Sequence, residues 1–248
     1  MKSSTETPKA VLAWSTGKDS AFALLEARRT AQVEIVGLLT TVTQPFDRVT
    51  MHGVRTALLD RQIEALGLPC LKIEIPYPCP NEVYEREMTT AMKHLREQGI
   101  NQVVFGDLFL EDCRAYREAR LAEVGMQAYF PLWKRDTATL AMEMIASGLH
   151  AIITCVDLKK LPASFSGRAY DKALLQDLPL AVDPCGENGE FHTFAWDGPM
   201  FRHPIATTPG EIVERDGFAF ADLLPLADPV SSPPTYKSFF PAHQAEGP

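Results

Sequence analysis

Paired cysteines, long apolar runs and a surplus of positive charge are all missing from this sequence. Its 5 cysteines stand at positions 70, 79, 113, 155 and 185, and no two of them form a C-x-x-C pair. An odd number at this spacing argues against a disulfide framework and against a cysteine-rich zinc site. We therefore expect reduced thiols, scattered through the core and the loops.

The other two absences bear on where the chain works and what it binds. No apolar run approaches the ~20 residues that a membrane span needs, and residues 1–9 lack the apolar centre of a signal peptide. The formal net charge is −8, which disfavours a broad footprint on nucleic acid or on an anionic membrane, since both require a basic face. We expect a cytoplasmic chain with neither a membrane nor a nucleic acid as its partner, although a local basic patch stays open.

What the sequence does contain is a regular alternation of strand-like and helix-like stretches. The chain is 46% hydrophobic and 23% charged over 248 residues, as expected of a globular protein. Aliphatic runs alternate with amphipathic runs as far as Val124, which predicts βαβ units and an α/β fold with a parallel sheet. The predicted strands are 9–14, 33–40, 70–75 and 102–105, and the predicted helices are 19–29, 56–66, 81–99 with Asn81 as its cap, and 113–124.

Three polar turns follow the predicted strands, at 15–20, 41–54 and 106–112. Ligands of parallel sheets bind beyond the carboxyl ends of the strands, so these turns are the expected walls of a site. The turn at 41–54 is long enough to be a functional loop.

The pattern changes near Trp133, and a smaller α/β domain is expected after it. A helix at 137–147, a strand at 151–156 and a helix at 168–178 are predicted there. We expect a disordered leader (1–8), two domains (9–134 and 135–224) and a Pro- and Ser-rich tail (225–248) that lacks a core of its own.

The most specific local signal is Val11–Ser20, which reads VLAWSTGKDS. A strand, a tight turn and a helix N-terminus together form an anion site, because free N–H groups and the helix dipole both favour phosphate. A Walker A loop needs glycine where Leu12 stands, and a dinucleotide fingerprint needs three glycines where only Gly17 is present, so both are excluded. The plain alternative is a Ser/Thr-Gly turn that caps a helix.

A second dense group of polar residues lies between Gly186 and Thr193, where the chain reads GENGEFHT. The glycines predict a tight turn that presents its side chains. Carboxylates there can orient a metal or an amine, and His192 can move a proton near neutral pH. A hydrophilic hairpin turn is the alternative.

Together these segments resemble the diphthine–ammonia ligase family of N-type ATP pyrophosphatases. The pyrophosphate loop of that superfamily usually reads SGGxDS, whereas Ser15–Ser20 reads STGKDS, which raises the question of whether Thr16 can adopt the backbone angles of a glycine. The matches cover about residues 9–220 and further include Met51–Arg55, Gly106–Asp107 with Arg114 and Arg117, and Pro131–Trp133.

The resemblance implies a Rossmann-like (HUP-type) domain that binds ATP (9–134) and a smaller α/β substrate domain (135–224) across a cleft. It implies that a carboxylate attacks the α-phosphorus of ATP, that pyrophosphate leaves, and that ammonia then displaces AMP to give an amide. The acceptor would be the diphthine side chain of elongation factor 2 or another acid, and Mg²⁺ would accompany ATP. Whether the chain forms a homo-oligomer stays open.

The expected site residues follow from the same resemblance. The ATP-binding group comprises Ser15, Thr16, Gly17, Lys18, Asp19, Ser20, Leu39, Thr40, Gly106 and Asp107, with Lys18 on the phosphates and Leu39 and Thr40 beside the adenine. Asp19 and Asp107 are the candidates for Mg²⁺. The catalytic group comprises Lys18, Glu187, Asn188, Glu190 and His192, the last four closing the site from the second domain around the acceptor or ammonia.

Two other functions stay open on the sequence alone. An RNA-modifying pyrophosphatase would share the loop but usually needs a basic face and often catalytic cysteines, and a nucleotide-binding protein without catalysis would need only the loop. Single residues also have plainer readings: His52 as a packing residue, Arg114 and Arg117 as solvated helix charges, and Cys185 as an unreactive thiol because no partner base is evident.

Overall fold

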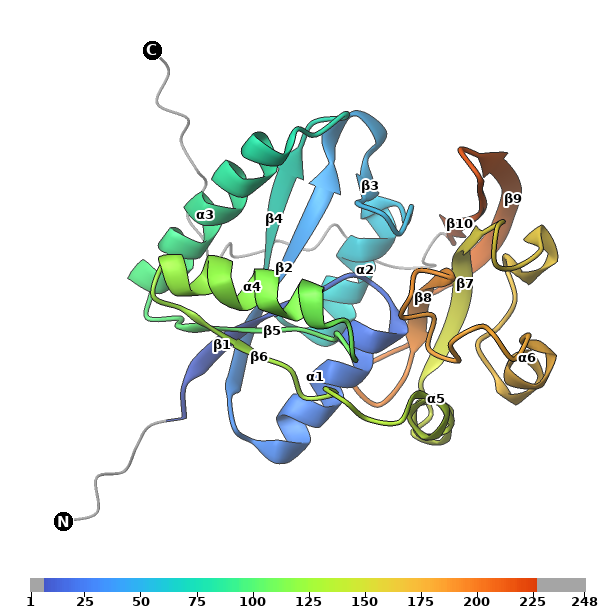
Figure 1. Ribbon diagram of the computed structural model, residues 1–248, viewed down its shortest axis with the longest axis horizontal. Coiled ribbons are helices and arrows are strands. Elements are labelled where there is room, and N and C mark those ends of the chain that lie inside the picture. Colours follow the sequence, from blue (N-terminus) through green and yellow to red (C-terminus); the bar gives the residue numbers. More distant parts are fainter. Residues whose placement is uncertain (1–6, 227–248) are drawn as a thin grey trace.

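The computed structural model describes residues 7–226, which fold around two β-sheets that lie side by side (Figure 1). The first sheet holds β1 (Lys9–Ala13), β2 (Glu34–Thr43), β3 (Arg48–Val49), β4 (Cys70–Ile75), β5 (Gln102–Val104) and β6 (Gln127–Tyr129). β1 pairs with β2 and β5, β2 with β4, and β5 with β6, all in parallel, whereas β3 is antiparallel to β2. The parallel order β4-β2-β1-β5-β6 reverses its direction beside β1, which is where such sheets bind ligands.

Helices cover both faces of the first sheet. α3 (Asn81–Glu97) and α4 (Glu111–Glu123) pack on one face, where Leu95, Val103 and Leu121 belong to one apolar core. α1 (Lys18–Thr30) and α2 (Thr56–Leu66) pack on the other face. Crossovers between parallel strands with helices on both faces are typical of the Rossmann-like fold, so the predicted fold class is confirmed.

The second sheet is antiparallel and belongs to the C-terminal half. Its strands are β7 (His150–Asp157), β8 (Phe191–Asp197), β9 (Thr207–Arg215) and β10 (Phe218–Pro225), in the order β8-β7-β10-β9. α5 (Thr137–Ala146) and α6 (Lys172–Asp177) lie beside it (Figure 1). The carboxylates of Asp136 and Asp171 cap these helices, accepting bonds from the N–H groups of Thr139 and Leu174 at 2.9 and 2.8 Å, which satisfies donors that have no intrahelical partner.

One apolar core joins the two sheets. α1 lies between them and has 8 buried residues, among them Phe22 and Leu24. The same core continues into Phe194 and Ala195 of β8 and into Leu223 of β10. A helix that is buried on nearly all sides needs partners on more than one face, so the position of α1 and of the turn before it depends on both sheets.

The structure departs from the sequence-based expectations at several elements. The polar connection expected at 41–54 includes the last residues of β2, the 3-10 turn η1 (Gln44–Phe46) and strand β3. Asn81 is the first residue of α3 and Pro80 stands at the N-cap, so the predicted cap is wrong. The helix expected from residue 168 begins only at Lys172, because Ala169 forms a β-bridge with Ile152.

Strands β3, β6, β8, β9 and β10 have no counterpart among the predicted strands. β9 shows why, since its sequence TTPGEIVER contains Pro and Gly, which are disfavoured within strands. It forms a strand because it pairs with β10 over most of its length.

The expected leader (1–8) and tail (225–248) lie almost wholly outside the described residues. Across residues 7–226, the structure contains no helix whose length and apolar character would suit a bilayer crossing.

Candidate functional site

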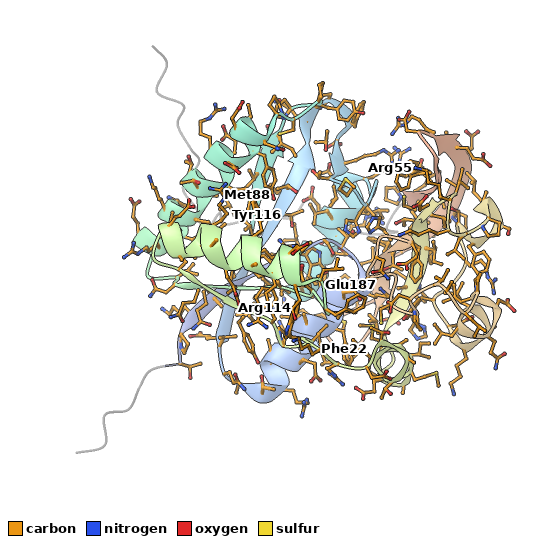
Figure 2. All side chains as sticks on the ribbon, viewed as in Figure 1. Phe22, Arg55, Met88, Arg114, Tyr116 and Glu187 are labelled. Atoms are coloured by element: carbon orange, nitrogen blue, oxygen red, sulfur yellow. The ribbon has the colours of Figure 1, made fainter. Side chains whose placement is uncertain are left out.

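A cleft of about 560 Å³ opens at the carboxyl ends of β1, β2 and β5, and the start of β8 closes its far side. This volume falls in the range of about 300–1,000 Å³ that is typical of ligand sites. The walls come from residues 13–15, 19–20, 39–41, 49–52, 105–107, 186–187, 189 and 191–193, together with residues of α3 and α4. Figure 2 places Glu187 between the helices of the first sheet and the second sheet.

A smaller cavity of about 70 Å³ adjoins the cleft between α3 and α4. It shares Leu39, Tyr84, Met88, Phe105 and Arg117 with the cleft. Met88 and Tyr116 mark its position in Figure 2. The apolar end of the cleft therefore extends beneath these two helices.

The loop between β1 and α1 contains a strained residue at its centre. Thr16 has φ = 71°, a left-handed conformation that is unfavourable for a β-branched residue. Its carbonyl accepts bonds from the Ala195 N–H at 2.9 Å and from Gln62 Nε2 at 3.0 Å. Thr16 therefore adopts a left-handed conformation that favours glycine, because partners in α2 and β8 hold it there.

Gln62 is the buried amide that organises this loop. Its Oε1 accepts the Trp14 Nε1–H bond at 2.8 Å, and its Nε2 donates to the carbonyls of Thr16 and Ala195 at 3.0 and 2.6 Å. The side chain is fully buried, where every satisfied hydrogen bond is strong and every lost one is costly. The shape of the loop thus rests on a network that spans both sheets.

The inner side of the loop presents hydroxyl and carboxylate groups to the cleft. Ser15, Asp19 and Ser20 line it. Ser20 Oγ donates to the Gly17 carbonyl at 2.9 Å and accepts from Ser15 Oγ at 3.2 Å. With the N-terminus of α1 at the same place, this wall has the backbone geometry and dipole that favour a phosphate.

The Lys18 side chain does not line the cleft. It is 1% exposed, and its Nζ donates to both carboxylate oxygens of Asp19 at 2.9 Å and to the carbonyl of Cys185. Burial alone would lower the pKa of Lys18, but Asp19, Cys185 and Glu187 together outweigh it and the net pKa is raised, so the ammonium stays charged. The Nζ thus lies outside the cleft in which we expect the phosphates.

Two further strand ends complete this wall of the cleft. Thr40 lines the cleft beside Leu39, and its hydroxyl donates to the Trp14 carbonyl at 2.8 Å. Gly106 follows β5, and a Cβ placed there would lie 2.8 Å from the carbonyl carbon of Asp19. Only glycine allows this close approach of the two turns. Asp107 also lines the cleft.

The opposite wall is the turn between α6 and β8, and Glu187 is its principal acid. Glu187 Oε1 accepts from the Leu108 N–H at 2.7 Å and from the Phe109 N–H at 3.4 Å, which ties the turn to the first sheet. Burial raises the pKa of Glu187 to about 7, although the bond from Leu108 works in the opposite direction. A carboxyl with this pKa exchanges its proton near neutral pH.

Asn188 and Glu190 do not line the cleft. Glu190 is 2% exposed, and its Oε1 accepts from the Asp183 N–H at 3.3 Å and from Asn188 Nδ2 at 3.1 Å. Asn188 is exposed, and its carbonyl accepts from Lys160 Nζ at 2.6 Å. These two side chains brace the turn from within.

His52 and His192 form a pair of imidazoles in the cleft, with ring centroids 4.6 Å apart. Burial, followed by the nearby Lys18 charge, lowers the pKa of His192 to about 4. Burial, followed by His192, lowers the pKa of His52 well below its usual value. Both rings are therefore neutral at pH 7, where His192 can act as a hydrogen-bonding group or as a weak base.

The two candidate Mg²⁺ ligands are each engaged with a cation. Asp19 pairs with Lys18, and Asp107 Oδ1 accepts from Arg117 Nε at 3.0 Å. Within residues 7–226 no group of three or more His, Cys, Asp or Glu side chains is arranged to hold a metal. Mg²⁺ usually binds proteins through one or two carboxylates plus substrate phosphates and water, so two acids facing a triphosphate site still fit this ion.

The cleft brings together residues that lie far apart in the sequence. Of the expected residues, those that line it are Ser15, Asp19, Ser20, Leu39, Thr40, Gly106, Asp107, Glu187 and His192. Arg117 and His52 line it as well, and their place in the matched segments was the only sequence signal for them. Arg114 instead stacks over Trp133 at 4.7 Å, and burial raises the pKa of the Cys185 thiol to about 12, which makes it inert.

Comparison with known proteins gives a consistent result. Residues 8–128 match the diphthamide synthase N-terminal domain, and residues 136–220 match the diphthamide synthase C-terminal domain. A diphthine–ammonia ligase of Danio rerio is 30% identical over 84% of this chain and 89% of its own length. That of Homo sapiens is 25% identical over 89% of this chain and 93% of its own. That of Schizosaccharomyces pombe is 33% identical over 40% of this chain and 18% of its own.

Proposed function

The chain belongs to the diphthine–ammonia ligase family, a family of ATP-dependent ligases, and we propose that it converts a diphthine-like carboxylate into an amide with ammonia, releasing AMP and pyrophosphate. The observation that carries this proposal is the shared cleft. The loop at 15–20 and the turn at 186–193 stand at opposite ends of the sequence, yet both face the same space. A reaction that joins nucleotide activation to amide formation requires both walls within reach of one carboxylate.

In this proposal the nucleotide lies along the first wall. Ser15, Ser20 and the N-terminus of α1 receive its phosphates, with Thr16 and Gly17 contributing through the backbone. Leu39 and Thr40 stand at the carboxyl end of β2, beside the adenine. The fixed donors of this wall stabilise the charge that develops on pyrophosphate as it leaves, without reorganisation at that moment.

Asp19 and Asp107 would hold a Mg²⁺ ion together with the phosphates. When bound, the ion would neutralise charge on the triphosphate. Asp107 would then leave Arg117 free to approach the nucleotide, since the two are now paired at 3.0 Å.

The second wall handles the proton in the amide-forming step. When ammonia attacks the acyl carbon, a C–N bond forms, the bond from that carbon to the oxygen of AMP breaks, and the nitrogen must lose a proton. Glu187 lines the cleft with a pKa of about 7, so its carboxylate accepts that proton at neutral pH. The neutral His52 and His192 rings offer hydrogen bonds to the acceptor without adding a charge that would bind the carboxylate too tightly to react.

The experiment is a product assay. The chain is incubated with ATP, Mg²⁺, ¹⁵N-ammonium and elongation factor 2 that carries diphthine, and the nucleotides and the acceptor are analysed. We expect AMP and pyrophosphate in equal amounts, with ¹⁵N in a new amide detected by mass spectrometry. Release of ADP without AMP, or AMP without ¹⁵N in the acceptor, would contradict the proposal. Elongation factor 2 without diphthine is the control and should give neither product.

A further inference from the structure

Lys18 belongs to the STGKDS motif and is the first residue of α1, yet its ammonium lies at the contact between this motif and the turn before β8. Its Nζ contacts Asp19 on its own loop and the Cys185 carbonyl on the opposite turn. The rings of Tyr170 and Phe191 lie 5.3 and 5.4 Å from it, a distance at which the face of an aromatic ring attracts a cation.

The backbone of Lys18 makes the same connection. Its N–H donates to Thr193 Oγ1 at 3.0 Å. A Cβ on the neighbouring Gly17 would lie 3.1 Å from the Thr193 carbonyl oxygen, so the loop and β8 are in close contact on both sides of the lysine. Main chain and side chain thus hold the loop against one segment, residues 185–193.

Both partners of the Lys18 ammonium lead directly into the cleft. Asp19 lines the nucleotide wall, and Cys185 stands two residues before Glu187 on the opposite wall. An ammonium has three donors, and the two Asp19 oxygens and the Cys185 carbonyl match that number. Reaching a phosphate would require this buried charge to abandon all of these partners, which is unfavourable.

We propose that Lys18 is a positioning residue that ties the loop at 15–20 to the two ends of the turn at 186–193, at Cys185 and Thr193, and so aligns Asp19 with Glu187 across the cleft, instead of binding the phosphates of the nucleotide itself. This inference rests on the proposed function, because the alignment matters only if both walls act on one substrate.

The test separates nucleotide binding from turnover in Lys18→Met, which keeps the stem and removes the charge. We expect its Kd for ATP, measured by calorimetry, to stay within about threefold of the wild-type value, since no phosphate contact is lost. Its kcat for amide formation should fall by about 10²-fold, as expected of misplaced catalytic groups. The pH at which kcat is half-maximal should shift, because Glu187 loses its fixed surroundings. Lys18→Arg should recover part of kcat.

A rise in the Kd for ATP of about tenfold or more in folded Lys18→Met would overturn the inference, since that is the signature of a lost charged phosphate contact. A kcat within twofold of wild type would overturn it too.

A second variant guards against misfolding of the first. Tyr170→Leu removes the ring beside Nζ and the bond from the Tyr170 hydroxyl to the Pro184 carbonyl at 2.8 Å, without altering the phosphate loop. Tyr170→Leu should lower kcat as Lys18→Met does, with the Kd for ATP unchanged. An unchanged kcat in Tyr170→Leu would contradict the proposed positioning role of Lys18. Binding of ATP is measurable without any acceptor, so failure of the proposed reaction leaves the Kd comparison intact and is recognised separately, by absence of AMP with the wild-type chain.

Discussion

The loop at 15–20 and the turn at 186–193 both carry a dense polar motif, and they use it differently. On the loop, Ser15, Asp19 and Ser20 reach the cleft, while the shape is held from outside by Gln62 and the Ala195 N–H. On the turn, Glu190 and Asn188 hydrogen-bond to each other and stabilise the conformation that presents Glu187 to the cleft. The lesson is that a motif defines a local structure, and that only part of it meets the substrate.

The turn makes this division within four residues. Glu187 points into the cleft, with a pKa of about 7. Glu190 accepts bonds from within the turn and is buried. Both residues are glutamates of the same motif. Substituting each in turn therefore compares a side chain that faces the cleft with one that stabilises the turn.

The largest expected effect is that of Glu187→Gln on catalysis. The amide keeps the acceptor oxygen for Leu108 but cannot take a proton, so kcat should fall by about 10²–10⁴-fold. In the wild type, kcat should rise with pH through about 7 as the carboxylate forms, and this limb should vanish in the variant. A pH–rate profile measures both. Glu64→Gln, at an exposed site on α2, is the matched control, and retention of the limb in Glu187→Gln would assign the proton to another group.

Glu187→Gln should lower kcat but raise the thermal stability of the protein above neutral pH. Because burial raises the folded-state pKa of Glu187 above its ordinary value, its favourable contribution is present below pH 4.5 and is lost as the pH rises through about 7. Glu187→Gln should therefore raise Tm at pH 8 and leave it nearly unchanged at pH 4. Equal shifts at both pH values would contradict this reading, and thermal unfolding followed by circular dichroism decides.

The nucleotide wall is best probed at Gly106. A Cβ there would lie 2.8 Å from the backbone of Asp19, and backbone cannot yield as a side-chain end can. Gly106→Ala should weaken ATP binding by about tenfold or more and lower the free energy of unfolding by about 1–3 kcal/mol. Gly99→Ala is a control in open space, and its φ of 78° adds a backbone strain that alanine at Gly106 would not meet. ATP affinity equal to wild type in Gly106→Ala would show that the two turns do not need to touch.

A smaller effect, on stability alone, is expected at Glu190. Glu190→Ala leaves the Asp183 N–H and Asn188 Nδ2 without their acceptor, which should lower the free energy of unfolding by about 1–3 kcal/mol. Well below the melting temperature, kcat should remain within about threefold of wild type, since the side chain does not line the cleft. Chemical denaturation measures the change in the free energy of unfolding, and initial rates measure kcat. A loss of kcat as large as that of Glu187→Gln would contradict the assignment of different roles to Glu187 and Glu190.

The smallest effect is expected for Thr16→Gly on the loop. The substitution removes the strain of φ = 71° and a buried hydroxyl without a partner, and it loses the burial of one methyl group and gains chain entropy in the unfolded state. These contributions nearly cancel, so the free energy of unfolding should change by less than about 1 kcal/mol. Thr16→Ala, which keeps most of the strain, is the comparison. A loss above about 2 kcal/mol in Thr16→Gly would mean that the side chain has a partner after all.

Local pattern was enough to predict the parallel sheet and the presence of most elements in the first half. Helix Thr56–Leu66 and strand Cys70–Ile75 have the predicted bounds, because a clear period and a glycine or proline stop mark their ends. β8 escapes such reasoning, since its partner β7 is separated from it by η2 and α6. β9 and β10 form a hairpin across Asp216 and Gly217, a local signal that the Pro and Gly within β9 obscured. The direction of Lys18 and Glu190 escapes such reasoning as well, because a motif specifies which residues are near one another and tertiary contacts decide where each side chain points.

The buried amide of Gln62 has a consequence for the history of such a molecule. Its side chain donates to one carbonyl of the 15–20 loop, that of Thr16, and to one carbonyl of the second sheet, that of Ala195. The local conformation of each half therefore depends on the other half. If recombination joined the N-terminal half to an unrelated C-terminal domain, the product would keep the STGKDS sequence but would lose the contacts that fix the backbone conformation of the loop. Exchange of one half for an unrelated domain is therefore disfavoured, and we expect the two halves to be inherited together.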